Sequence, residues 1–361
     1  MSTESVTAQS KRKKEHGLRD YVIRRLLLMI PTFIGATLVV FVLCQFLPGG
    51  PIDQARLRMM TGGGTGGESS GGGSSRSTAV ANVSDKDLEG LREYYGFNDP
   101  IPIRYAKYMK KLVTLDFGNS FRFTVPALKL IRNRLPISIY YGVITTILTY
   151  VVCIPLGILK AIRHRTFVDN ATSVVIFVGY GIPGYALGAV LLTLFAVQHE
   201  YFPLGGFVGQ NFESLSAWGK AKDLVWHSIL PLVCYMVGSF AFMTMLMKNS
   251  LMENMSADYV RTTLAMGLPS RRAIFVHAFR NSLIPLATSF GSNIAIILTG
   301  SLLIERVFNI QGMGMLFFES IQSRDYPVVM AHTIIATVLL LVGNLLSDIC
   351  VAVVDPRVRF R

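Results

Sequence analysis

Charged side chains are scarce in this chain: Asp, Glu, Lys and Arg make up only 16% of its 361 residues. A soluble domain usually carries about 25% charged residues. The shortage occurs together with long uncharged runs and 51% hydrophobic residues, so an ordinary soluble domain is excluded. Because the apolar runs have the length of membrane-spanning helices, we predict an all-α polytopic membrane protein.

Two kinds of chemistry are also missing. The four cysteines lie far apart, in or beside apolar runs, and none forms a Cys-x-x-Cys pair, so each fits a small buried hydrophobic side chain. No G-x-x-x-x-G-K-[ST] motif occurs, so no nucleotide-binding loop is expected. We predict no metal, no cofactor and no enzyme activity in this chain; any ATP and magnesium would be bound by a partner chain.

Six apolar runs are long enough to cross a membrane, since a spanning helix needs about 20 mainly apolar residues. None of the six contains Asp, Glu, Lys or Arg. The runs are 26–47, 136–159, 171–198, 228–247, 281–304 and 326–347. The sequence therefore predicts six transmembrane helices.

The net charge of +13 is concentrated at the ends of these runs. Lys and Arg are frequent in the N-terminal flank, between the second and third runs, between the fourth and fifth, and at the C-terminus. The positive-inside rule then predicts that both termini lie in the cytoplasm. This clustering also argues against nucleic acid as a partner.

The chain divides into a basic cytoplasmic tail at 1–20, predicted to be disordered, and a transmembrane domain at 21–361. Residues 48–134 form an extended periplasmic region with a Gly/Ser-rich linker at 61–77. A basic amphipathic helix is predicted at 103–115 within that region. We expect it on the outer membrane surface, with packing against a partner as the alternative. Residues 248–280 form a polar cytoplasmic loop.

This loop carries a motif that resembles the coupling loop of permease subunits in ABC-type peptide importers. The motif runs over 258–267 and resumes at 279–285 with Phe-Arg-Asn-Ser-Leu-Ile-Pro. Residues 47–54 resemble the Yej-type branch of the B-type permeases, which is linked to oligopeptide and microcin C uptake. Further matches in the same order lie at 21–27, 30–32, 116–120, 135–138, 179–183, 300–305, 312–314, 324–327 and 355–357.

The resemblance implies a type I ABC importer permease architecture in the cell inner membrane, with transport of peptides by alternating access. It implies as partners a second homologous permease and a periplasmic peptide-binding protein, besides the peptide itself and membrane lipid. ATP hydrolysis would take place on two ATPase subunits or on one fused ATPase.

The resemblance also assigns residues that couple the chain to the ATPase. A short helix at about 256–265 would dock through Tyr259, Val260 and Thr262. Arg261 would meet an acidic rim, or be an ordinary positive-inside charge. Gly267 would end the helix in a left-handed conformation. The family pattern reads Arg-Thr-Ala-Arg-Ala-Lys-Gly, so Leu264 and Met266 replace two basic residues, and their effect on coupling is left open.

Two other functions remain as alternatives, a self-sufficient secondary carrier or channel and a subunit of an ABC exporter. A carrier usually buries ionisable groups in its spans, whereas here the spans offer mainly His332, Gln45, Asn293 and Asn344. The long external region and the loop motif favour import over export. Hydroxyl side chains in the spans either line a peptide pathway or pack between helices; they are Thr145, Thr146, Thr149, Ser289, Ser292 and Thr299.

Overall fold

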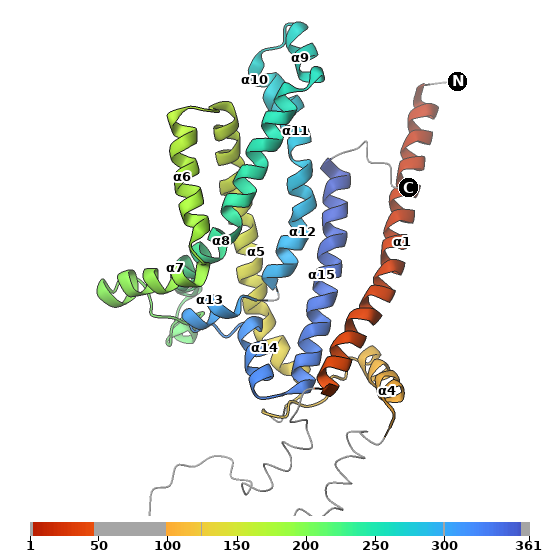
Figure 1. Ribbon diagram of the computed structural model, residues 1–361, viewed down its shortest axis with the longest axis vertical. Coiled ribbons are helices and arrows are strands. Elements are labelled where there is room, and N and C mark those ends of the chain that lie inside the picture. The colour runs from red at the N-terminus through yellow and green to blue at the C-terminus, as the bar shows by residue number, and fades with distance from the viewer. Residues whose placement is uncertain (1–2, 47–98, 124, 299, 355–361) are drawn as a thin grey trace, which may run out of the picture. The chain divides into compact units, whose positions relative to one another are not determined.

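The fold is given by a computed structural model that describes residues 3–46, 99–123, 125–298 and 300–354 (Figure 1). Across these ranges the regular structure is helical and no strand is assigned, apart from one isolated bridge between Asn119 and Pro126. The prediction of an all-α fold is confirmed. The Gly/Ser-rich linker at 61–77 lies outside the described residues.

Four helices are long and apolar enough to cross a membrane. They are the part Tyr21–Leu43 of α1 (Thr3–Phe46), α5 (Ala127–Ile162), α8 (Ala217–Ser256) and α15 (Tyr326–Val354). They contain the second, fourth and sixth predicted spans and residues 26–46 of the first, and these four are thereby confirmed as helices of spanning length.

The third predicted span is not one straight helix. It consists of α6 (Phe167–Gly181) and α7 (Gly184–Leu191), which continues as the π-helix η1 (Leu192–Gln198), and the two parts meet at 94°. Pro183 causes the break, because a proline disfavours helical backbone at the residue before it. Ile182 accordingly is extended, with φ −96° and ψ 118°.

The fifth predicted span is shorter than expected. α11 (Phe279–Ser282) precedes α12 (Ile284–Leu298), which has 15 residues. Gly300, with φ +89°, turns the chain before the predicted end at 304. The prediction of six transmembrane helices is therefore confirmed only in part. The described residues contain four such helices, or five if the bent pair counts as one span.

The N-terminal residues also differ from the prediction. α1 begins at Thr3, so residues 3–20 are helical where a disordered tail was predicted. This stretch has no proline, and it is rich in Lys, Arg and Glu, which all favour helix. The helix of the first span therefore extends toward the N-terminus.

The chain separates into two compact units, one formed by 1–33, 133–316 and 335–361, the other by 34–132 and 317–334. In the first unit α8 is the central helix, and it packs against α6, α7, α11, α12 and α13 (Leu302–Val307). α5 runs beside it, since Tyr141 stacks on Tyr235 with ring centroids 5.6 Å apart.

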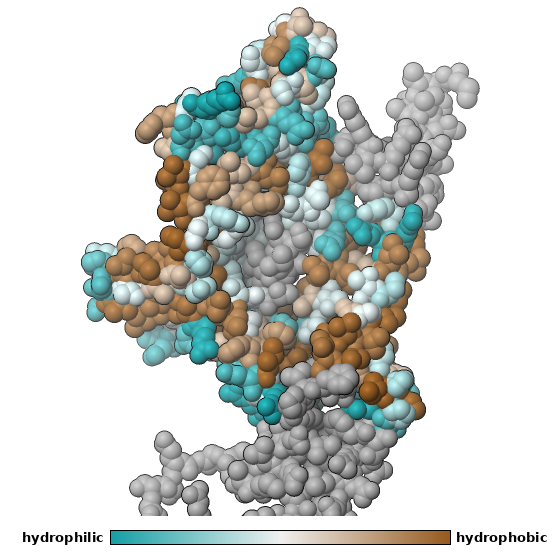
Figure 2. Space-filling view, viewed as in Figure 1, coloured by the Kyte–Doolittle hydropathy of each residue, from teal (hydrophilic) through white to brown (hydrophobic). Residues whose placement is uncertain are grey.

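The surface of the first unit is uneven in polarity. On the face drawn in Figure 2, hydrophobic colour covers α7 and the segment that follows it, while hydrophilic colour gathers toward the end that carries α9 (Asp258–Ala265). The exposed large apolar side chains of α7 and η1 include Tyr185, Val190, Leu194 and Val197. An apolar surface of this kind suits contact with lipid or with another membrane protein.

In the second unit, the predicted amphipathic helix is confirmed as α4 (Ile101–Val113). Its apolar face packs on α1: the ring of Phe41 lies 5.4 Å from that of Tyr105 and 5.7 Å from that of Tyr108. The Tyr105 hydroxyl also lies 2.9 Å from Oγ1 of Thr37. The chain itself covers part of this face, while Ile101, Ile103 and Val113 remain exposed, so the position of α4 on the outer membrane surface stays a prediction.

The loop after α4 is held by a buried carboxylate. Asp325 accepts hydrogen bonds from the Ser120 hydroxyl and from the backbone N–H groups of Phe121, at 3.0 Å, and Arg122, at 3.4 Å. Because an unpaired buried carboxylate is costly, these donors fix the loop to the start of α15.

Candidate functional site

A short helix, α9, stands at the end of α8 (Figure 1). α8 ends at Ser256, Ala257 is extended with φ −70° and ψ 148°, and α9 begins at Asp258. The predicted helix at 256–265 is therefore present but starts two residues later. Asp258 lies in the first turn, where the helix dipole favours a negative charge.

Buried side chains anchor α9 to the rest of the unit. Val260 is 2% exposed and packs in one apolar cluster with Met247 and Leu251 of α8 and with Ala161 of α5. In this structure Val260 therefore does not present its side chain to a partner. Its position fits an anchor of α9 rather than the docking contact that the sequence predicted.

Tyr259 holds α9 by hydrogen bonds from its hydroxyl. The hydroxyl donates to Oδ1 of Asn254 on α8 at 2.7 Å and accepts from Nδ2 of Asn281 on α11 at 3.1 Å. The structure thus brings together three residues from three helices. Sequence reasoning missed the roles of Asn254 and Asn281, although Asn281 lies within the motif at 279–285.

The outer face of α9 is exposed and mixed in character. Arg261 and Thr262 are exposed, and the Arg261 guanidinium lies 3.8 Å from the Asp258 carboxylate. Ion pairs this exposed contribute little to stability, so Arg261 is available to another protein. Leu264 and Met266 are also exposed, Met266 by 67%, which places two apolar side chains beside the arginine.

Gly267 ends the helix as predicted, with φ +83°. Its N–H donates to the Leu264 carbonyl at 2.9 Å, and the N–H of Leu268 donates to the Thr263 carbonyl at 3.3 Å. These bonds satisfy carbonyl groups at the end of the helix. The direction in which the chain leaves α9 is therefore fixed by backbone geometry.

Replacing Tyr259 by phenylalanine should loosen α9 without unfolding the unit. The change removes two hydrogen bonds whose combined loss we put at about 1 kcal/mol, so amide hydrogen exchange in 258–265 should be about fivefold faster. Exchange in α12, which Tyr259 does not contact through these bonds, is the internal control. Unchanged exchange in α9 would show that the hydroxyl does not hold it.

The other candidate residues, the possible metal ligands and the hydroxyl side chains of the spans, do not form a site in the part of the chain that the structure describes. Within the described residues, no three His, Cys, Asp or Glu side chains are grouped to hold a metal ion. Thr146 and Ser289 donate to carbonyls of their own helices at 2.8 and 3.1 Å, as packed hydroxyls do. Thr145 and Thr149 are buried with hydroxyl groups that have no partner. The side chains of Ser292 and Thr299 lie outside the described residues.

Comparison with known proteins gives matches over most of the chain. Residues 153–360 match the family described as "Binding-protein-dependent transport system inner membrane component". The inner membrane ABC transporter permease protein YejB of Escherichia coli O157:H7 is 38% identical over 362 residues, which are 94% of this chain and 98% of that protein.

Two further relatives carry substrate names. The peptidoglycan transport system permease protein YejB of Agrobacterium fabrum is 37% identical over 356 residues, covering 94% of this chain and 98% of that protein. The oligopeptide transport system permease protein AppB of Bacillus subtilis is 34% identical over 341 residues, covering 94% and 99%.

Proposed function

The chain belongs to the family of binding-protein-dependent transport system inner membrane components, and we propose that its helix α9 is the surface on which a separate ATPase acts. The resemblance to B-type permeases of peptide importers, including the Yej type, is confirmed. The chain is a permease subunit of a peptide importer. This assignment replaces the secondary carrier and the exporter subunit as alternatives.

One observation carries the proposal for α9: the helix is anchored on one side, and its other side exposes both charged and apolar side chains. Val260 and Tyr259 hold it to α8 and α11, while Arg261, Thr262 and Met266 face outward. Since the sequence has no nucleotide-binding motif, ATP and magnesium belong to the partner, and this chain needs no cofactor. The partner is two ATPase subunits or one fused ATPase.

The remaining partners follow from the same assignment. A second homologous permease completes the pathway, a periplasmic binding protein delivers the peptide, and lipid covers the apolar belt. Lys and Arg around α9 support its placement in the cytoplasm, with both termini on that side. Within the transmembrane domain at 21–361, residues 48–134 form the periplasmic region and 248–280 the coupling loop.

Short peptides are the proposed substrates. The relatives named for oligopeptides and for peptidoglycan both transport material that contains peptide bonds. Backbone amides are common to all such substrates, so we propose recognition of the peptide backbone, with the choice of side chains made by the binding protein.

Purification of the tagged chain from its own membrane in mild detergent tests the proposal. We expect a Walker-type ATPase and a second multi-span permease to co-purify, and the reconstituted complex to import peptide only with ATP and the binding protein. A solitary chain that transports peptide under an ion gradient would contradict the proposal.

A further inference from the structure

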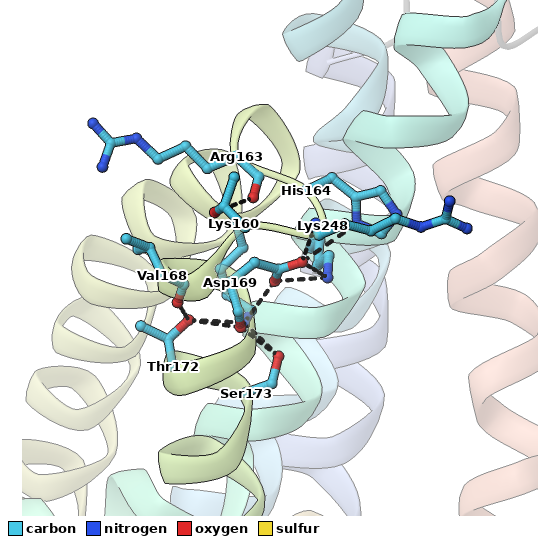
Figure 3. Close-up of polar contacts among 10 residues, drawn as sticks. Lys160, Arg163, His164, Val168, Asp169, Thr172, Ser173 and Lys248 are labelled. Atoms are coloured by element: carbon cyan, nitrogen blue, oxygen red, sulfur yellow. Dashed lines mark hydrogen bonds and ion pairs between the residues drawn. The ribbon is translucent and has the colours of Figure 1, made fainter.

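A buried ionic cluster joins α5, α6 and α8 at the α9 end of the first unit (Figure 3). Asp169 lies in the first turn of α6, and both lysines of the cluster contact its carboxylate. Nζ of Lys248 on α8 donates to its two carboxylate oxygens at 2.8 Å each. Nζ of Lys160, near the end of α5, lies 3.0 Å from Oδ1 of the same carboxylate.

The cluster is closed to solvent and carries excess positive charge. The side chains of Lys160, Asp169 and Lys248 are 0%, 2% and 9% exposed. Two ammonium groups and one carboxylate give a net charge of +1. Removing a single partner from a buried charge pair is costly, because the remaining charge loses its compensation. Asp169 and Lys248 are therefore held together firmly.

The two lysines are bound in different ways. Lys160 also donates to the Asp169 carbonyl at 2.8 Å and to the hydroxyls of Thr172 and Ser173 at 2.9 and 2.7 Å, so it has several partners in α6. Both hydrogen bonds of Lys248 go to the Asp169 carboxylate. Lys160 thus ties two helices that follow each other in the chain, whereas Lys248 ties α6 to a distant helix.

Lys248 lies next to the anchor of α9. It follows Met247 and precedes Leu251, the two α8 residues that pack in the cluster with Val260. From Lys248 to Ser256 the chain is one uninterrupted helix that leads directly into α9. A displacement of α9 therefore reaches the ion pair through about two turns of helix.

We propose that the Lys248–Asp169 ion pair positions α6 relative to α8 during transport. When α8 moves at its α9 end, the pair transmits this movement to α5 and α6. The inference rests on the proposed function, because it assumes that an ATPase moves α9. Apolar packing alone lets helices slide, whereas separating this pair leaves the buried Lys248 ammonium group uncompensated and takes from Asp169 one of its two lysines. The pair makes α6 follow α8.

Two matched substitutions test the proposal in the assembled importer. Lys248→Met and Lys160→Met each remove one buried ammonium group and each leave Asp169 with one lysine. Only Lys248→Met cuts the tie between α6 and α8. The measured quantity is peptide imported per ATP hydrolysed in proteoliposomes.

We expect Lys248→Met to lower this ratio about tenfold while ATP hydrolysis continues, and Lys160→Met to lower it about twofold. Asp348→Asn, which breaks the 2.8 Å ion pair with Arg25 between α1 and α15, should leave the ratio unchanged. The inference would be overturned if Lys248→Met imports as much peptide per ATP as the unaltered importer, or if both lysine variants lower this ratio equally.

A charge exchange keeps the test decisive if Lys248→Met fails to assemble. Asp169→Lys with Lys248→Asp, made in the Lys160→Met chain so that no second ammonium group faces the new one, rebuilds one pair of opposite charges between α6 and α8. Recovery of assembly and of the ratio supports the tie, and loss of the ratio despite assembly, or no assembly, overturns it. If the unaltered complex shows no ATP-dependent import, the proposed function itself is contradicted.

Discussion

Replacement of Gly267 by valine should abolish peptide uptake and leave the chain in the membrane. Gly267 has φ +83°, a region that costs a side-chain-bearing residue about 1–2 kcal/mol, and more when the side chain is β-branched. No atom lies within 4 Å of the position that a Cβ would occupy, so the effect is backbone strain and not crowding. The strain is relieved by unwinding the end of α9, which displaces its exposed face. Uptake in cells, normalised to the chain found in the membrane fraction, measures the result.

Gly267→Asn is the matched control, because asparagine tolerates the left-handed conformation at helix ends. It should retain most of the uptake. Normal uptake by Gly267→Val would count against α9 as the coupling surface. Equal loss in both variants would assign the effect to side-chain bulk on that surface and not to the turn.

Gly291→Ala should prevent the chain from accumulating. A Cβ at this position would lie 1.5 Å from the Gly343 carbonyl oxygen, so α12 packs directly against α15. Overpacking typically costs about 1–3 kcal/mol, and we expect about 3 kcal/mol or more here because a backbone atom cannot rotate aside. The Ser347 hydroxyl, which accepts from the Gly291 N–H at 2.8 Å and donates to the Thr288 carbonyl at 2.7 Å, would be displaced as well.

The amount of chain in membranes and its melting temperature in detergent are the measurements for Gly291→Ala. Gly179→Ala on α6 is the matched control, since nothing lies within 4 Å of its added Cβ. It should accumulate like the parent. A Gly291→Ala chain that accumulates and melts like the parent would show that α12 and α15 are not packed as closely as described.

Features encoded in a short stretch of sequence were predictable. Long uncharged runs mark four of the spanning helices, and Gly267 marks the end of α9 because a left-handed residue there is a local requirement. The bend of the third span was not predicted, although Pro183 was visible. Proline is tolerated in membrane helices, and packing of α7 on α8 and α13 decides its direction.

Contacts between distant residues were not predictable. Lys248 was interpreted as a positive-inside charge, since nothing near it in the sequence indicates Asp169, which is 79 residues away. The burial of Val260 was missed for a similar reason. In an eight-residue helix, a few apolar side chains do not show which face is covered, and here α8 and α5 decide it.

Because α8 is long, a small rotation of this helix moves its end over a large distance. With 40 residues it extends for about 60 Å, about twice the thickness of the hydrocarbon core of a bilayer. If it pivots near the middle of the membrane, a tilt of about 10° sweeps its end through about 5 Å. An ATPase that acts on α9 therefore needs to rotate α8 by only a small angle. It acts at a point beyond the lipid headgroups.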